Sequence, residues 1–192
     1  MEQISNKKVQ ILESALELIR EHGFHGCPIS QVAKHASVAS GTVYTYFDSK
    51  DEMIFELYRY VKSEILKEIS EKDDLQKNFE ERFYDFWDNL TSLYQERPAF
   101  QSFLDQFTSS PYNTDAIQLE NDPWGEWTMA FFKEGIESGD LRSLNPRILA
   151  IMVMGSIISL IRFRIYFKTK SASASEDLHL ISQMVWDGIK NQ

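Results

Sequence analysis

The stretch from Gln31 to Lys50 reads QVAKHASVASGTVYTYFDSK, and it decides the fold of the first part of the chain. Apolar residues at helical spacing predict a short helix from about Ser30 to Ala36, with Ser30 at the N-cap position. A second short helix is predicted from about Ser40 to Phe47, after a turn at residues 37–39. Two short helices joined by a tight turn form a helix-turn-helix, whose second helix fits the major groove of DNA.

The second predicted helix has one anchoring side and one outward side. Residues advance by about 100° along a helix, so Val43 and Phe47 lie together and can hold the helix in a core. The residues that point away or lie on the flanks are Gly41, Thr42, Thr45, Tyr44 and Tyr46. A glycine lets the backbone approach DNA closely, and hydroxyl groups bind phosphates or bases. The pattern alone leaves an ordinary helical hairpin with aromatic packing as the alternative.

This segment resembles the DNA-binding domain of the tetracycline-repressor (TetR) family. The pattern of that family reads Ala-Gly-Val-Ser-x-Gly-Thr-Leu-Tyr-x-Tyr-Phe, followed by x-x-Lys-x-x-Leu. The residues in matching positions are Ala36, Val38, Gly41, Thr42, Val43, Tyr44, Tyr46, Phe47, Lys50 and Met53. A predicted helix from about Asn6 to His22, followed by Gly23-Phe24-His25-Gly26, is also similar to the family. The resemblance extends to about Phe55, and beyond it rests on architecture.

The resemblance implies which residues bind DNA. Thr42, Tyr44 and Tyr46 are expected to contact phosphates or bases, and Gln31 and Thr45 are expected to read bases. Lys50 is expected to hold a phosphate at the start of the next helix, and Ser30 and Gly41 complete the expected set. Ser49 and Glu52 have the spacing of a capping box, which would fix where that next helix begins.

Two positions depart from the family pattern. Ser37 replaces the turn glycine, which costs about 1–2 kcal/mol if the turn needs a left-handed residue. Ala39 replaces the serine N-cap of the recognition helix, and the loss of such a cap typically costs about 1 kcal/mol. Ser40 could restore the cap if the helix began one residue later.

Composition restricts the class of protein. The 192 residues are 43% hydrophobic and 13% aromatic, enough for a small domain and a larger one. The net charge is −9, but residues 1–50 hold five basic and five acidic residues, so the excess of acid lies in residues 51–192. The polar N-terminus does not resemble a secretory signal. The longest apolar run, Ile148 to Ile161, is shorter than the roughly 20 residues of a membrane span, so we expect a cytoplasmic protein.

No pattern of an enzyme or a metal site is present. Cys27 is the single cysteine, and His22, His25 and His35 lack the spacing of metal ligands. A buried, unreactive Cys27 is favoured over a redox sensor. There is no glycine-rich phosphate loop or nucleophile elbow, and the acidic residues Glu80, Glu81 and Glu134 resemble solvated helix faces. We therefore expect no enzymatic activity and no cofactor.

The remaining chain is predicted to be helical, which makes the fold all-α. We expect a three-helix DNA-binding domain over residues 1–50 and a helical ligand-binding and dimerisation domain over residues 51–192. The first predicted helix of this part is Lys50–Ser70, with an apolar stripe at Met53, Leu57, Val61, Ile65 and Ile69. It is followed by Leu75–Gln95, a shorter helix from Pro98, one from Pro123 to Gly139, and Pro146–Lys168. The last predicted helix starts at Ser175 and has a stripe at Leu178, Ile181, Val185 and Ile189.

The last two helices are expected to form a homodimer interface. The helix from Pro146 is apolar on nearly every side and must be buried on more than one of them. Gly155 and Ser159 are small residues that permit close helix contact. A central core helix within one subunit is the alternative. A two-fold dimer would place two recognition helices in successive major grooves of a roughly palindromic operator.

An aromatic-rich body is expected to enclose a cavity for a flat or apolar effector. The candidate lining residues are Phe83, Trp87, Phe103, Phe107, Trp127, Phe131 and Met152. Asp85 and Glu134 could meet a cationic group, and a plain aromatic core is the alternative for every residue named.

The sequence therefore favours a dimeric transcriptional repressor that a small molecule releases from DNA by displacing the helix from Lys50. The alternatives are a constitutive regulator or activator of the same family, and a helical interaction module or unrecognised enzyme that has lost DNA binding.

Overall fold

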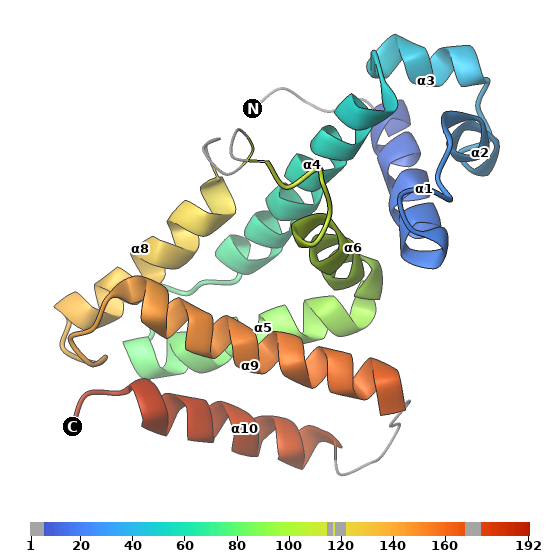
Figure 1. Cartoon of the computed structure of the whole chain (residues 1–192). Helices are drawn as coiled ribbons and strands as arrows, with labels where there is room; N and C mark the ends of the chain where they lie inside the picture. The colour runs from blue at the N-terminus through green and yellow to red at the C-terminus, as the bar shows by residue number, and fades with distance from the viewer. Residues whose placement is uncertain (1–5, 115–116, 118–121, 168–173) are drawn as a thin grey trace. The chain divides into compact units, whose positions relative to one another are not determined.

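The computed structural model describes residues 6–114, 117, 122–167 and 174–192; the side chains of 165–167 and 174–177 lie outside the described part. Within these ranges the chain forms α-helices and no β-sheet, which confirms the predicted all-α class (Figure 1). The chain divides into two compact units, of residues 1–64 with 97–121, and of residues 65–96 with 122–192. These units are defined by packing, so the functional boundary after residue 50 stays a prediction.

The first unit contains the N-terminal helices and one helix from later in the chain. Helix α1 packs against both α2 and α6, and α2 packs against α3. The buried side of α1, which includes Ile11, Leu12, Leu16 and Ile19, supplies much of the core of this unit. The helices are α1 (Asn6–His22), α2 (Ile29–His35), α3 (Ser40–Tyr46), most of α4 (Lys50–Glu71) and α6 (Pro98–Thr108).

Helix α2 begins one residue earlier than predicted. Pro28 is the N-cap, and its carbonyl accepts hydrogen bonds from the amides of Gln31 and Val32 at 2.9 and 3.1 Å. Ser30 is therefore inside the helix, and its expected role as the cap is wrong. The reason is that the extended Pro28 already supplies the first helical acceptor, with no side-chain cap.

The turn between α2 and α3 uses a left-handed residue that is not glycine. Ser37 has φ of 54°, the one positive φ among the described non-glycine residues. The Val38 amide donates to the Ala33 carbonyl at 2.9 Å, and the Gln10 side chain donates to the Ala36 carbonyl at 2.9 Å. These bonds hold the turn in a conformation that costs a residue with a Cβ about 1–2 kcal/mol.

Helix α3 lacks a side-chain cap at its start. The N-cap is Ala39, and the helix begins at Ser40, so Ser40 does not take over the capping role. The helix ends at Tyr46 rather than at Phe47, which is the C-cap and adopts an extended conformation. With seven residues, α3 is shorter than the roughly 12 residues at which isolated helices become marginally stable.

Helix α4 begins at a modified capping box. The Glu52 amide donates to the Ser49 hydroxyl at 3.1 Å, as predicted. The Glu52 carboxylate accepts a hydrogen bond from the amide of Asp48, rather than from Ser49 as a regular capping box requires. The predicted apolar stripe of α4 is confirmed, because all five of its residues are buried.

The second unit contains the last turns of α4 and four further helices. In Figure 1, α5, α9 and α10 run side by side, and α9 also packs against α8. Helix α5 begins four residues later than predicted, because the side chain of Asn78 accepts from the Glu81 amide at 2.9 Å and forms the cap there. The four helices are α5 (Phe79–Glu96), α8 (Pro123–Glu137), α9 (Pro146–Phe167) and α10 (Ala174–Ile189).

Helix α10 is buried along a different line from the predicted stripe. Ser182, Trp186 and Ile189 are buried, whereas the other members of the predicted stripe are only partly covered. The ring of Trp186 packs on Phe83 at 5.0 Å and near Phe79 at 6.4 Å, so the large aromatic ring determines which side faces α5. Helix α10 begins at Ala174, one residue before the predicted start at Ser175, and the side chain of Ser175 lies outside the described part.

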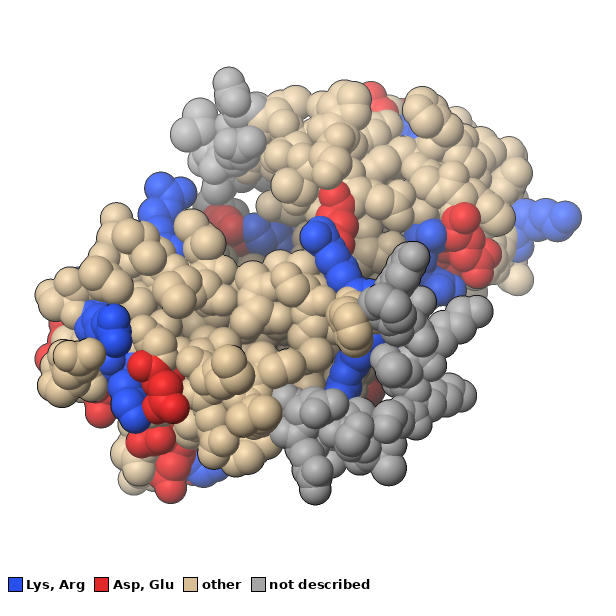
Figure 2. Space-filling model, turned by 60° about the horizontal axis from the view of Figure 1, so that its bottom comes forward, with Lys and Arg blue, Asp and Glu red and all other residues tan. Residues whose placement is uncertain are grey.

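Helix α9 is apolar on its exposed side as well as on its buried side. The stretch Pro146–Arg164 has a mean hydropathy of 1.7 over 19 residues, and 28% of it is buried. Its length and composition alone would allow it to cross a membrane, which corrects the expectation based on the shorter uninterrupted run. Figure 2 turns the side with α9 and α10 forward, and uncharged side chains dominate the surface there.

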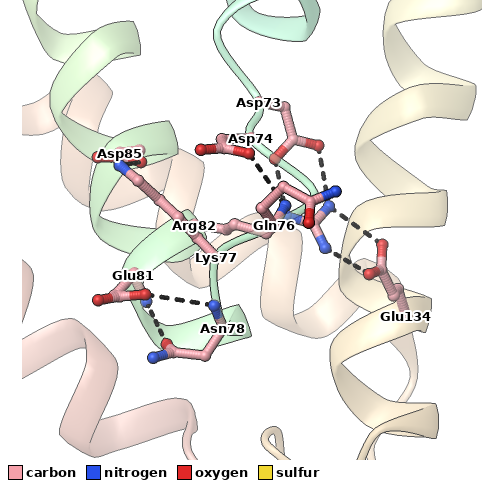
Figure 3. A network of polar contacts seen from close by, with 9 residues as sticks. All are labelled: Asp73, Asp74, Gln76, Lys77, Asn78, Glu81, Arg82, Asp85 and Glu134. Carbon is pink, nitrogen blue, oxygen red and sulfur yellow. Dashed lines mark hydrogen bonds and ion pairs between the residues drawn. The ribbon is translucent and has the colours of Figure 1, made fainter.

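An ion-pair cluster around the buried Arg82 joins three parts of the second unit. Arg82 of α5 is only 5% exposed. Its guanidinium donates to the Asp73 carboxylate at 2.8 and 2.9 Å and also to Glu134 of α8 (Figure 3). Its planar face lies over the rings of Phe79 and Phe131. The hydrogen bond to Asp73, together with that to Glu134, raises the pKa of Arg82 above its ordinary value, so the guanidinium stays charged at any physiological pH.

We predict that Ser37→Gly stabilises the protein. Glycine adopts the left-handed conformation without the Cβ penalty, and after its entropic cost we expect a gain of about 0.5–1 kcal/mol. Thermal and urea unfolding measure the effect. Ser40→Gly is the control, because Ser40 lies in α3 with a negative φ, and that change should lower stability. A Ser37→Gly protein no more stable than the original would show that the turn is not strained.

We predict that Arg82→Met destabilises the second unit by about 3 kcal/mol, because the Asp73 carboxylate, whose side chain is only 13% exposed, loses its partner. Urea unfolding followed by tryptophan fluorescence gives the value. Lys77→Met is the matched control: Lys77 is exposed and pairs with Asp85 at 2.6 Å (Figure 3), so its loss should change stability little. Equal effects of the two changes would argue against the cluster as a structural anchor.

Candidate nucleic-acid interface

Helix α3 is held by its two predicted anchors. Val43 and Phe47 are buried, as are Val32 and Ala33 on the adjacent α2. The ammonium group of Lys8 lies 5.6 Å from the centre of the Phe47 ring and pairs with Glu56 of α4 at 2.7 Å. The anchoring side of the recognition helix is therefore where the sequence predicted it.

The opposite side of α3 is open to solvent. Tyr44 is 55% exposed, and a Cβ at Gly41 would meet no atom within 4 Å. The Thr45 hydroxyl donates to the Gly41 carbonyl at 3.1 Å, and because Thr45 is exposed its oxygen can still accept a hydrogen bond. Ser30 and Gln31 of α2 are also exposed, whereas the expected contacts Thr42 and Tyr46 are partly covered. Small and hydroxyl-bearing groups thus form the accessible surface of this helix.

Lys50 has a structural partner that the sequence did not reveal. Its ammonium group donates to the Phe24 carbonyl in the connection between α1 and α2. Two of the three ammonium hydrogens remain available for a phosphate. Cys27 lies in the same connection, and burial raises the pKa of its thiol to about 11, although Lys50 opposes the shift. A thiol with this pKa stays protonated and unreactive.

Tyr112, which follows α6, packs on the same region. Its ring lies 5.1 Å from that of Phe24, and its hydroxyl donates to Asp51 of α4 at 3.1 Å. Burial, with the hydrogen bond to Asp51, raises the pKa of Tyr112 to about 12. The start of α4 is thus tied to a segment far along the chain, a contact for which the sequence gives no signal.

Two lysines add to the candidate phosphate contacts. Lys7 of α1 and Lys34 of α2 are exposed, and neither forms an ion pair within the described part of the chain. Arg20, in contrast, is paired with Glu17 at 2.8 Å. The charge count of the sequence included both lysines, but only their exposure and lack of acidic partners distinguish them from Arg20.

The predicted ligand-lining residues fall into both units. Phe83, Trp87 and Phe131 are buried in the second unit, and Phe103 and Phe107 are buried in the first. Trp127 is partly covered and stacks on Phe131 at 5.4 Å, while Met152 is 48% exposed on α9. A cavity of about 10 Å³, enough for one water, lies among residues that include Asp73, Arg82, Phe86 and Trp127. Their positions do not test whether the seven residues bind a ligand, so that role remains a proposal.

Comparison with known proteins agrees with this geometry. The model for bacterial regulatory proteins of the tetR family matches residues 11–57, and the model for the tetracyclin repressor-like C-terminal domain matches residues 78–190. An uncharacterized HTH-type transcriptional regulator of Haemophilus influenzae is 29% identical over 152 residues, which is 79% of each chain.

Solved structures share the fold. A TetR family transcription regulator from Marinobacter aquaeolei has a TM-score of 0.86 and 22% identity, over 97% of this chain and 96% of that one. The transcriptional regulator FadR from Bacillus subtilis, in complex with stearoyl-CoA, has a TM-score of 0.71 and 21% identity, over 93% and 95% of the two chains. The matched proteins are regulators of transcription and not enzymes. With one family model covering more than half of its length, the chain belongs to the TetR family of DNA-binding transcriptional regulators.

Proposed function

We propose that this protein is a homodimeric repressor that binds a roughly palindromic operator and is released by a small hydrophobic or aromatic effector. The observation that carries the proposal is the division of α3 into a buried side and an open side. Tyr44, Gly41 and Thr45 are accessible while Val43 and Phe47 hold the helix. This arrangement presents hydroxyl groups and bare backbone to a major groove.

Within the interface, the contacts divide into two groups. One group would bind the phosphate backbone and set the position of the DNA-binding head, which is residues 1–50. This group contains Tyr44, Tyr46, Thr42, Lys50 and Ser30. Gln31 and Thr45 would read base edges, with Gly41 allowing close approach. Lys7 and Lys34 would add two phosphate contacts. Few cations lie in this part of the chain, so affinity should depend strongly on the presence of two heads in one dimer.

Exposed apolar side chains on α9 and α10 support the dimer. Ile151 and Met184 are the most exposed, and no charged group dominates this side in Figure 2. A Cβ at Gly155 would meet no atom within 4 Å, which leaves room for a partner helix. The exposed apolar residues of these two helices are Ile148, Ile151, Met152, Phe163, Leu180 and Met184.

A second copy of the chain accounts for this surface better than a membrane does. Large apolar patches on a monomer mark sites of association. The matched proteins are regulators of transcription, and α9 is partly covered by α5, α8 and α10 of its own chain. We therefore assign the protein to the cytoplasm, with α9 and α10 of two copies packed together.

An effector would act by favouring one of two arrangements of the dimer. The related FadR binds stearoyl-CoA, and the body of this chain is rich in buried aromatic rings. A ligand that binds better to an arrangement with α4 displaced would favour that arrangement. The distance between the two DNA-binding domains of the dimer would then no longer match the spacing of the two half-sites. DNA affinity should then fall while the dimer stays intact.

The alternative is a constitutive regulator or an activator of the same family. The close aromatic packing of the second unit favours it: Phe86 lies 5.1 Å from Phe131, and Trp127 lies 5.9 Å from Trp124. A body filled by its own side chains would need no effector. Release of operator DNA by a bound small molecule distinguishes the two readings.

We predict that the protein enriches one or a few near-palindromic sites from fragmented DNA of its source genome, and that Tyr44→Ala abolishes the enrichment. Gln31→Ala should still bind but lose about 1–3 kcal/mol of discrimination at one base pair of each half-site. Gln95→Ala, at an exposed glutamine of α5, is the control and should change neither. Undiminished enrichment by a folded Tyr44→Ala protein would exclude α3 as the DNA-contacting helix.

We predict that Ile151→Glu separates the dimer into 22.4 kDa monomers, because a carboxylate would be buried in an apolar interface. Operator affinity should fall at least about 100-fold as the two heads lose their linkage. Light scattering and a DNA-binding titration measure the two effects. Leu75→Glu is the matched control, because both side chains are 71% exposed. A dimer that survives Ile151→Glu would place the interface elsewhere.

A further inference from the structure

Thr91 has a buried hydroxyl group without a partner. It lies on α5, is 2% exposed, and is the one residue of the described chain whose buried side-chain nitrogen or oxygen lacks a hydrogen bond. Buried polar groups in folded proteins are nearly always hydrogen-bonded, and each exception needs an explanation. The hydroxyl of Thr91 therefore lowers the stability of the ligand-free protein unless something binds it.

Other buried hydroxyl groups in the second unit are satisfied by their own helix. Thr128 donates to the Trp124 carbonyl at 2.8 Å, and Ser182 donates to the His179 carbonyl at 2.9 Å. Such bonds to the preceding turn are the usual outcome for threonine and serine in helices. Thr91 does not form the corresponding bond to Trp87, so its hydroxyl is left without a partner.

The buried residues next to Thr91 on α5 are apolar or already paired. Trp87 lies one turn before Thr91, and its indole N–H donates to the Ser156 hydroxyl of α9 at 3.2 Å. That hydroxyl in turn donates to the Val153 carbonyl at 2.6 Å. Leu90 beside Thr91 is also buried. The buried side of α5 thus combines a large apolar surface with a single unpaired hydroxyl.

The interior of the second unit offers no uncompensated charge. Among the described buried residues, Arg82 is the one charged side chain, and both Asp73 and Glu134 neutralise it (Figure 3). A charged group placed beside Thr91 would lose its hydration without gaining an opposite charge, which is strongly unfavourable. An uncharged group with an oxygen atom would lose little.

We infer that Thr91 is the polar contact of the effector, and that the effector is an apolar molecule whose buried part carries an uncharged hydroxyl or carbonyl oxygen. The Thr91 hydroxyl donates to a carbonyl oxygen, and it donates to or accepts from a hydroxyl group. A carboxylate or phosphate group of the same molecule stays outside this part of α5. The assignment rests on the proposed release by a small molecule, and it names the chemical class of that molecule.

The first test needs no ligand. Thr91→Val keeps the shape of the side chain and removes the unpaired hydroxyl, so Tm should rise by about 2 °C or more. Thr128→Val is the matched control: it removes a hydrogen bond that is formed, so Tm should not rise. A fall in Tm for Thr91→Val would mean that the hydroxyl already has a partner, such as a water, and would overturn the assignment.

The second test uses two matched pairs of probes. The linear pair is 1-dodecanol and dodecanoate, and the flat pair is 2-acetylnaphthalene and 2-ethylnaphthalene. In at least one pair, calorimetry or tryptophan quenching should show tighter binding of the uncharged oxygen-bearing member, and dodecanoate should not bind more tightly than 1-dodecanol. Thr91→Val should weaken that binding about tenfold, whereas Thr91→Ser, which keeps the hydroxyl, and Thr128→Val should not.

Three results would overturn the inference: no preference for the uncharged oxygen-bearing probe in either pair, an unchanged affinity in Thr91→Val, or tighter binding of dodecanoate than of 1-dodecanol. Operator binding and dimer mass are measured on the same proteins. If both persist while the probe tests fail, the Thr91 assignment fails and the DNA-binding dimer stands. If the unmodified protein binds no operator, the proposed function fails, whatever the probes do.

Discussion

The burial of Val43 and Phe47 is the interaction on which the DNA-binding surface depends. Helix α3 has seven residues and no side-chain cap, so it cannot be stable by its own hydrogen bonds. Its position comes from these two side chains in the core of the first unit. Because they face inward, Tyr44 and Thr45 are left exposed on the other side of the helix.

The turn before α3 shows how the rest of the head compensates for an unfavourable residue. Ser37 occupies a left-handed conformation, and the amide of Gln10 on α1 binds the carbonyl of Ala36 next to it. The long side chain of Lys50 similarly binds the Phe24 carbonyl. Side chains from helices distant in sequence thus hold two connections of the head that lack strong local signals.

The second unit buries a charged side chain and exposes apolar ones. Its one described buried charge, Arg82, is enclosed by two carboxylates and two aromatic rings. Its α9–α10 side carries large apolar groups toward solvent. Removing one partner of a buried charge is costly because it leaves the charge uncompensated, whereas an exposed apolar surface gains stability only when a partner covers it. The ion-pair cluster around Arg82 links parts of the second unit to one another, and the apolar side of α9 and α10 favours association with a second copy of the chain.

The sequence alone determined the all-α class, the helix-turn-helix and the stripe of α4, because periodic burial and the family pattern are local properties of the chain. It also placed the open side of α3 through simple helical geometry. It could not place Trp186 on α5, start α5 at Asn78 or pair Lys50 with Phe24, since these depend on which surfaces meet after folding. Nor could it distinguish Thr91 from Thr128, two helical threonines in similar apolar surroundings. Only the tertiary structure decides whether such a hydroxyl bonds to its own helix or remains unpaired.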